Sequence, residues 1–317
     1  TVLLWRRRYK QGGLAGIVED SPRSGRPKRI SEAREAAIVE ATIKTKPKDA
    51  THWSVRAMAA SQKVSPGTVQ RIWKRHKLQP HRVESFKFSN DPDFAPKVRD
   101  IVGLYLNPPD KAIVLSVDEK SQIQALDRTQ PGLPFKKGRC GTMTHDYKRN
   151  GTTTLFAALD TLQGKVVGEC HQRHRHQEFL KFLRRLDMEF PGKVPLHLVM
   201  DNYGTHKHEK VRQWLKRNPR FVPHFVPTSS SWLNLVERWF GHLTQKAIRR
   251  GVFLSVADLQ ASIEAFMLAW NQNPKPFVWT ATVESIQEKL NRCRQTLEQI
   301  QPGCTKPKTR KRRAITV

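Results

Sequence analysis

The sequence predicts an α/β protein in which a basic, all-α N-terminal region precedes a mixed five-stranded sheet flanked by helices. Two observations carry this prediction. Through residues 32–82, apolar residues recur at helical spacing behind serines that suit helix starts. From residue 111 onward, short β-branched apolar runs come first and then alternate with amphipathic segments. This order is typical of a sheet that carries helices on its faces.

The charge of the chain indicates a polyanionic partner. Its 317 residues include 57 Lys and Arg against 28 Asp and Glu, which gives a net charge of +29 and a pI of about 10.5. Each phosphate that a basic side chain neutralises releases condensed counterions, so nucleic acid is the favoured partner. A ribosomal protein is the plain alternative, but the eight tryptophans in this long chain argue against it.

Membrane segments, structural zinc and disulfides find no support in the sequence. No apolar run approaches the roughly 20 residues that a transmembrane helix requires. The four cysteines are far apart and form no CxxC pair, so reduced thiols in a cytoplasm are expected.

The N-terminal segment is basic and helical. Residues 1–20 are interpreted as the remnant of a first helix-turn-helix whose beginning is missing. A basic linker follows at residues 21–31, with a Gly-Arg-Pro tripeptide that holds Arg26 and is followed by Lys28. A narrow extended segment with cations suits an A·T-rich minor groove. An ordinary flexible linker explains the tripeptide equally well.

Residues 32–82 predict a helix-turn-helix DNA-binding domain. Ser31 and Ser65 suit helix caps, and Pro66 stands at the first position of the third helix, where a missing N–H costs nothing. Basic residues without any acid between 63 and 82 favour major-groove contact over a solvated surface. The outward residues of the third helix are therefore the predicted DNA contacts, namely Thr68, Gln70, Arg71, Lys74 and Arg75.

The remaining chain divides into a linker with one helix at residues 83–110, an α/β domain at 111–295 and a basic disordered tail at 296–317. The expected strands of the α/β domain are residues 112–117, 153–159, 165–170, 196–200 and 220–226. The expected helices are residues 175–189, 206–217, 232–249 and 256–271.

Two of the predicted strands run into aspartate, at Asp118 and Asp201. The carboxyl ends of strands in an open α/β sheet form the crevice where ligands bind. Two acids that meet there repel each other unless a cation lies between them. For either aspartate alone, a role as the cap of a turn is the simpler interpretation.

A third acid, Glu237, lies in a helix that Ser231 or a neighbouring serine is expected to cap. The buried stripe of that helix is predicted to contain Trp232, Val236, Trp239, Phe240 and Leu243, with Glu237 at its margin. From that margin a carboxylate can reach a crevice at the sheet edge. Pairing with Arg238 on the surface is the ordinary alternative.

Taken together, these motifs resemble a family of bacterial insertion-sequence transposases. The family belongs to the mariner-related DDE superfamily and is called after insertion sequence six-thirty. The spacing of 35 residues between Asp201 and Glu237 matches the family, as does the Gly-Arg-Pro linker. The residues that carry the likeness are Val117-Asp118-Glu119-Lys120-Ser121, Asp201-Asn202-Tyr203 with His206, and Trp232-Leu-Asn-Leu-Val-Glu237.

The resemblance implies an RNase H-like core and a catalytic triad of Asp118, Asp201 and Glu237 that binds two Mg²⁺ or Mn²⁺ ions. In this arrangement Asp118 bridges the two ions, and Asp201 and Glu237 each complete one site. The implied partners are double-stranded DNA, as terminal inverted repeats and target, and a second copy of the chain. A bacterial cytoplasmic, nucleoid-associated location is expected, with no membrane partner and no small-molecule cofactor.

Several further residues invite a functional interpretation. Asn202, His206 and Asn234 are candidates for side chains that support the three acids. Glu119 follows Asp118 on a strand, so its side chain is expected on the opposite face and outside the chemistry. The cluster of His171, His174 and His176 is better explained by contact with DNA phosphate than by a metal site. The tryptophans 232, 239, 270 and 279 are expected in the core.

Other functions remain open to the same sequence. A non-catalytic helix-turn-helix regulator would need no acids at the sheet edge. A nuclease that cuts without joining would have the same acids as a transposase. An inactive transposase remnant is the third alternative, which the intact triad disfavours.

Overall fold

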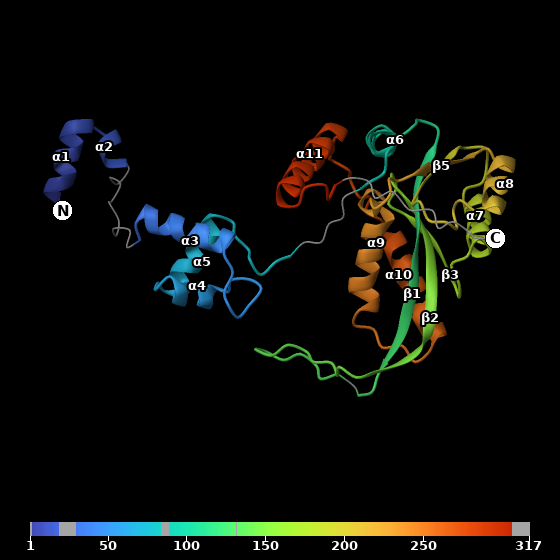
Figure 1. Cartoon of the computed structure of the whole chain (residues 1–317), viewed down its shortest axis with the longest axis horizontal. Coiled ribbons are helices and arrows are strands. Elements are labelled where there is room, and N and C mark those ends of the chain that lie inside the picture. The colour runs from blue at the N-terminus through green and yellow to red at the C-terminus, as the bar shows by residue number, and fades with distance from the viewer. Residues whose placement is uncertain (1, 19–29, 84–88, 131, 306–317) are drawn as a thin grey trace. The chain divides into compact units, whose positions relative to one another are not determined.

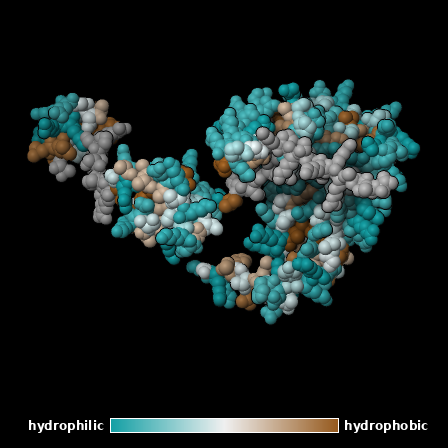
Figure 2. All heavy atoms as spheres, in the orientation of Figure 1, coloured by the Kyte–Doolittle hydropathy of each residue, from teal (hydrophilic) through white to brown (hydrophobic). Residues whose placement is uncertain are grey.

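The computed structural model describes residues 2–18, 30–83, 89–130 and 132–305. The chain divides into two compact units, Thr1–Phe86 and Lys87–Val317 (Figure 1). The predicted minor-groove residues Arg26 and Lys28 lie outside the described residues, as do residues 306–317 of the predicted tail. Hydrophilic residues cover most of the visible face of the larger unit (Figure 2).

The N-terminal unit is entirely helical, as predicted. It contains α1 (Val2–Gly12), α2 (Ala15–Val18), α3 (Glu32–Lys44), α4 (Val55–Ser61) and α5 (Pro66–Arg75). The described side chains of α1 and α2 include no buried one. The helices α3, α4 and α5 enclose a small core of Ile38, Met58, Ala59, Val69, Ile72 and Trp73.

The starts of these three helices follow from their caps. The side chains of Ser31, Ser54 and Ser65 each accept a hydrogen bond from the backbone N–H three residues later. The indole of Trp73 donates to the hydroxyl of Thr42 at 2.9 Å, which ties α5 to α3. The predicted helix-turn-helix is therefore confirmed as a fold.

The second unit is built on a mixed five-stranded sheet in the order β3-β2-β1-β4-β5. The pairs β1·β2 and β2·β3 are antiparallel, whereas β1·β4 and β4·β5 are parallel. The strands are β1 (Ile113–Arg128), β2 (Tyr147–Asp160), β3 (Val166–His171), β4 (Leu196–Met200) and β5 (Phe221–Phe225). The predicted sheet is confirmed, but β1 and β2 are longer than expected. They continue as a hairpin whose connection contains the bridge Leu133↔Thr142.

Helices cover both faces of this sheet (Figure 1). On one face, α7 (His176–Glu189) and α8 (Glu209–Arg217) pack against Leu115 and Val117 of β1. On the other face, the next apolar core includes α9 (Val236–Leu243) and α10 (Val256–Gln272). A third core joins α6 (Phe94–Leu106) and α11 (Val283–Ile300) to Val114 of β1 and Val199 of β4. The alternating side chains of β1 thus face different helices.

The helix α11 is a correction to the predicted boundary of the tail. A disordered tail was expected from residue 296, yet α11 extends to Ile300. Thr282 caps its start by accepting from the backbone N–H of Ser285, and Ile286 is buried against α6. Among the residues that the structure describes, every helix is too short or too polar to cross a membrane.

Candidate active site

The sequence predicted Asp118 at the end of a strand. Asp118 instead lies inside β1, which continues to Arg128. The parallel pairing of β1 with β4 ends at Ser116↔Val199, but the antiparallel pairing with β2 continues through Asp118↔Ala157. Because β4 ends while β1 goes on, Asp118 lies just beyond the last residue of β1 that pairs with β4. Its side chain is on the α9 face of the sheet, and the residue is only 7% exposed.

Asp201 follows the last residue of β4, Met200, as predicted. Its Oδ1 accepts a hydrogen bond from the backbone N–H of Tyr203 at 2.9 Å. The same oxygen forms an ion pair with Nδ1 of His206 at 2.9 Å. Burial alone would raise the pKa of Asp201, but these contacts outweigh burial and hold the pKa below its usual value. Asp201 is therefore set up as an ionised carboxylate.

Glu237 lies in the first turn of α9. The predicted helix from residue 232 is wrong in its start, because a 3₁₀ turn, η1 (Ser231–Leu233), precedes a break at Asn234. Ser231 therefore does not cap α9, and Trp232 is 47% exposed where a buried side chain was predicted. The other four members of the predicted stripe, Val236, Trp239, Phe240 and Leu243, are buried.

The three predicted acids interact electrostatically, and we call them the acidic cluster. Burial raises the pKa of Asp118 to about 8, and the charges of Asp201 and then Glu237 add to this rise. The pKa of Glu237 is also raised, by burial and by Asp201, although Lys120 opposes the rise. Like charges that meet in a poorly hydrated crevice are stabilised by a cation.

Oxygen donors of this kind fit a hard divalent ion such as Mg²⁺ or Mn²⁺. Within the described residues, no three His, Cys, Asp or Glu side chains already stand as a complete set of metal ligands. The fit therefore rests on the chemistry of the donors and on the burial and mutual repulsion that raise the pKa of Asp118.

Asn234 forms a hydrogen bond with one member of the acidic cluster, Asp118. Its side-chain amide donates to the backbone carbonyl of Val117 at 2.9 Å and to Oδ2 of Asp118 at 3.2 Å. The residue is 1% exposed, and its own amide oxygen has no hydrogen-bond partner in the structure. Tyr105 of α6 holds the preceding turn, because its hydroxyl donates to the carbonyl of Leu233 at 2.8 Å.

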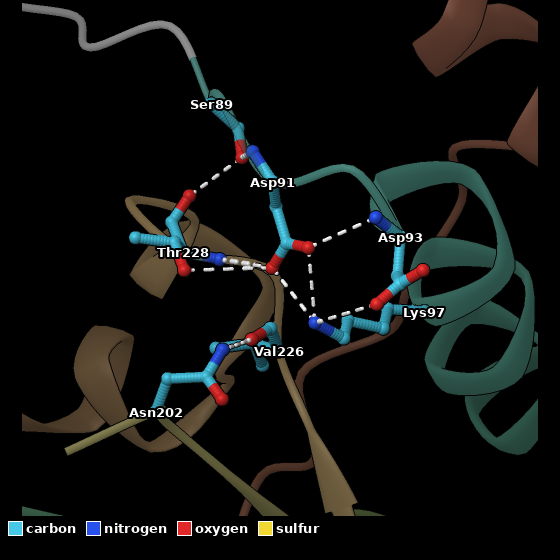
Figure 3. A network of polar contacts seen from close by, with 7 residues as sticks. All are labelled: Ser89, Asp91, Asp93, Lys97, Asn202, Val226 and Thr228. Atoms are coloured by element: carbon cyan, nitrogen blue, oxygen red, sulfur yellow. Dashed lines mark hydrogen bonds and ion pairs between the residues drawn. The ribbon is translucent and has the colours of Figure 1, made fainter. Parts of the chain in front are cut away.

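A polar network fixes the loop of residues 226–235 that leads from β5 to α9 (Figure 3). Oδ2 of Asp91 accepts from the backbone N–H of Thr228 at 2.9 Å and from the Lys97 ammonium at 2.8 Å. The Ser89 hydroxyl donates to the Thr228 carbonyl at 2.6 Å. The segment that enters this unit is thereby attached to the loop that carries Asn234 and precedes Glu237.

Asn202 contacts the same loop and not the acidic cluster. Its side-chain amide donates to the carbonyl of Val226 at 2.5 Å (Figure 3). It therefore ties the residue after Asp201 to the start of the 226–235 loop. This contact forms because β4 pairs with β5, which lies about 20 residues further along the chain. Composition and spacing do not reveal such a pairing.

His206 and Glu119 form a contact that sequence reasoning missed. Glu119 does point to the face opposite Asp118, as alternation requires. There its carboxylate meets Nε2 of His206 at 3.1 Å, and the Nδ1 atom of the same ring meets Asp201. The pKa of His206 rises to about 10, because its contacts with Asp201 and Glu119 outweigh the opposing effect of burial.

The histidine cluster has no metal-site geometry among the described residues. His176 stacks on His208 with ring centroids 3.6 Å apart, and His171 lies 3.4 Å from a carboxylate oxygen of Glu169. His174, His176 and His208 line a pocket of about 600 Å³ together with Arg173 and Tyr203, whereas His171 does not line it. The proposed contact with DNA phosphate stays a prediction.

The predicted DNA-contacting residues lie on α5. Gln70, Arg71 and Lys74 are exposed, whereas Thr68 is half-buried with its hydroxyl 2.9 Å from that of Ser65. Arg75 forms an ion pair with Glu35 of α3 at 2.6 Å, so it also stabilises the fold.

The tryptophans that were predicted in the core differ in their exposure. Trp239 is fully buried, in agreement with the prediction. The exposed Trp232 stacks on Trp279 with ring centroids 6.2 Å apart, and Trp270 is half-buried, with its indole donating to the carbonyl of Gly164.

Comparison with known proteins finds a family match for each of the two units. Residues 113–260, which carry all three acids, match the DDE superfamily endonuclease domain. This part of the second unit is therefore similar to DDE superfamily endonucleases. Residues 1–73 match a homeodomain-like domain, in agreement with the helical N-terminal unit.

One relative of the chain is encoded by an insertion element. Over 113 residues the chain is 31% identical to the insertion element IS630 uncharacterized 39 kDa protein of Shigella sonnei. That match takes in 36% of this chain and only 33%, about one third, of the relative.

Solved structures confirm the fold of the chain. The Mos1 mariner paired end complex with Mn matches with a TM-score of 0.53 at 16% identity, over 92% of this chain and 85% of that one. The Mos1 strand transfer complex matches with a TM-score of 0.52 at 18% identity, over 92% and 84%. The predicted RNase H-like core is thus confirmed by the fold that it shares with these transposases.

Proposed function

We propose that this chain is a DNA transposase that binds the terminal inverted repeats of an insertion sequence, cleaves their strands and joins them to target DNA. The observation that carries the proposal is the acidic cluster. Burial and two neighbouring acids raise the pKa of Asp118 to about 8, a cost that a bound cation would remove. The match to the DDE superfamily endonuclease domain supports the same chemistry.

Asp118, Asp201 and Glu237 are the proposed ligands of two divalent cations, Mg²⁺ or Mn²⁺. Asp118 is assigned the bridging position, and the other two acids each complete one site. When bound, two such ions activate the attacking oxygen and stabilise the leaving oxygen of a phosphodiester. Mos1 paired end complexes with Mn and with Mg support the use of divalent ions in this fold.

The chain's own residues prepare this site. Asn234 holds Asp118 through its amide, and the backbone N–H of Glu119 donates to the other oxygen of Asp118 at 2.8 Å. The 226–235 loop brings Asn234 under β1 and leads into the helix that carries Glu237. These contacts limit the rotation of Asp118 before substrate arrives, which favours a defined geometry of attack.

The N-terminal unit is the proposed DNA-recognition part. Gln70, Arg71 and Lys74 would contact base edges or phosphates from α5 in a major groove. The net charge of +29 favours binding to DNA of any sequence as well. A homodimer that pairs two element ends is proposed from the resemblance to paired end complexes of Mos1.

Three assays on the full chain separate this proposal from its rivals. A transposase nicks end-containing plasmid in Mg²⁺ but not in EDTA, and it also joins a pre-cut end to target DNA. A nuclease would show the nicking without the joining. A regulator would bind end DNA and show neither reaction, and its binding would not respond to Asp201→Asn.

A further inference from the structure

Glu119 is linked to both Asp118 and Asp201, although its side chain lies on the opposite face of the sheet from Asp118. Its backbone N–H donates to Oδ1 of Asp118 at 2.8 Å. Its carboxylate lies 3.1 Å from Nε2 of His206. The other ring nitrogen of His206 lies 2.9 Å from Oδ1 of Asp201. A single residue therefore connects to both aspartates of the acidic cluster.

This arrangement is buried and geometrically constrained. The side chain of His206 is 0% exposed and that of Glu119 is 8% exposed. The imidazole also packs against Phe179 of α7, with ring centroids 4.5 Å apart. Because both ring nitrogens are occupied and one ring face is covered, the imidazole has little freedom to rotate.

Asp201 needs such support more than Asp118 does. It follows the end of β4, and its side chain is 36% exposed, so the strand alone does not fix its carboxylate. The His206 ring and the backbone N–H of Tyr203 both contact Oδ1. Two contacts on Oδ1 restrict the rotation of the Asp201 carboxylate.

Resting on the proposed function, we propose that Glu119 and His206 are positioning residues that orient Asp201 for divalent-cation binding. Glu119 holds the imidazole, and the imidazole holds Asp201. Side chains that orient a metal ligand from behind raise metal affinity by about 10- to 100-fold in other proteins. A salt bridge that served the fold alone would have no such effect.

The test measures Mn²⁺ binding to the full-length protein by electron paramagnetic resonance, with thermal unfolding measured in parallel. Glu119→Ala and His206→Ala are expected to raise the Kd for Mn²⁺ about tenfold or more. Cleavage by these variants should recover at high Mn²⁺ concentration. If Glu119→Ala does not fold, Glu119→Gln keeps the side-chain volume, and an increase in Kd of about threefold is expected.

Glu178→Gln is the matched control. The Glu178 side chain is 12% exposed and paired with Arg175 at 2.7 Å, so its burial and pairing resemble those of Glu119. It has no recorded contact with the acidic cluster. This variant should unfold at a lower temperature yet keep the Kd for Mn²⁺ within twofold of the wild-type value.

A Kd within twofold of wild type for both Glu119 variants would overturn the positioning role. A failure of the proposed function itself looks different. In that case the wild-type protein binds no Mn²⁺ at this site, and Asp118→Asn leaves binding unchanged.

Discussion

Two aspartates of the same unit have opposite electrostatic environments. Asp118 is 7% exposed, and it faces the acids Asp201 and Glu237. Asp91 is half-buried as a residue, although its side chain is only 4% exposed, and it accepts from the Lys97 ammonium and from the backbone N–H groups of Thr228 and Asp93. The pKa of Asp118 is raised to about 8, whereas the pKa of Asp91 is lowered because these donors outweigh burial.

This contrast teaches that burial of a carboxylate does not by itself mark a functional site. Asp91 is compensated by donors that the fold supplies, so its charge stabilises the fold that holds the 226–235 loop. Asp118 lacks a comparable cation, and its neighbours repel it. An uncompensated buried acid is costly to folding and is therefore a better indicator of chemistry.

The largest expected effect is on catalysis. Asp118→Asn should lower metal-dependent cleavage of end DNA by about 10³-fold or more, because it removes the proposed bridging ligand. Asp91→Asn keeps a polar group in the loop network and should lower cleavage far less. Single-turnover cleavage of a labelled element end in Mg²⁺ measures both rates. Cleavage by Asp118→Asn at the wild-type rate would refute the assignment.

The second effect is on stability at Asp91. Asp91→Ala leaves the half-buried Lys97 ammonium without its closest partner, so the free energy of unfolding should fall by about 3 kcal/mol. The neighbouring Asp93 is 71% exposed and lies 3.9 Å from Lys97, and Asp93→Ala should cost less than about 0.5 kcal/mol. Urea denaturation of both variants tests the contrast, which fails if the two changes cost the same.

The third effect has the opposite sign and depends on pH. The folded pKa of Asp118 of about 8 lies above the ordinary value of 3.8 for an aspartate, so folding favours its protonated form. Its contribution to stability is therefore present at low pH and is lost as pH rises from about 4 toward 8. In EDTA at pH 8, Asp118→Asn should raise the free energy of unfolding by about 2 kcal/mol, because a buried charge is removed.

At pH 4 the same substitution should have almost no effect on stability, because the wild-type carboxyl is then neutral in the folded state. Urea denaturation at the two pH values gives the comparison. A destabilising effect of Asp118→Asn at pH 8 would mean that the fold already compensates this charge, as it does at Asp91.

The smallest expected effect is that of the metal on stability. At ten times its Kd, Mg²⁺ should stabilise the wild-type protein by about 1.4 kcal/mol, since it binds the folded state. Asp118→Asn should lose this stabilisation, and Asp91→Ala should keep it despite its lower starting stability. Thermal unfolding with and without Mg²⁺ measures the difference, and equal stabilisation of all three proteins would remove the distinction between the two aspartates.

Local signals in the sequence predicted the helical unit and the central strands well. Ser31 and Ser65 cap the helices that follow them, as predicted, and β4 has the predicted bounds of Leu196–Met200. A cap acts on residues within one turn, and a buried strand is a short apolar run. Both signals are contained in a few neighbouring residues.

Signals that depend on distant partners were missed or misplaced. β1 extends to Arg128 because β2 continues to pair with it, and the sequence of β1 alone does not reveal this pairing. The start of α9 was placed too early, because Asn234 leaves the helical path to hydrogen-bond with Val117 and Asp118. The Glu119–His206 contact joins residues 87 positions apart, so no local pattern announces it.

The central claim is that the acidic cluster holds a divalent cation. Its most direct test is a crystal of the full chain with element-end DNA and Mn²⁺, with diffraction recorded at the manganese absorption edge. We predict an anomalous peak within about 2.5 Å of carboxylate oxygens of both Asp118 and Asp201. A map in which manganese occupies only other positions, such as the loops of His171, His174 and His176, would contradict the account.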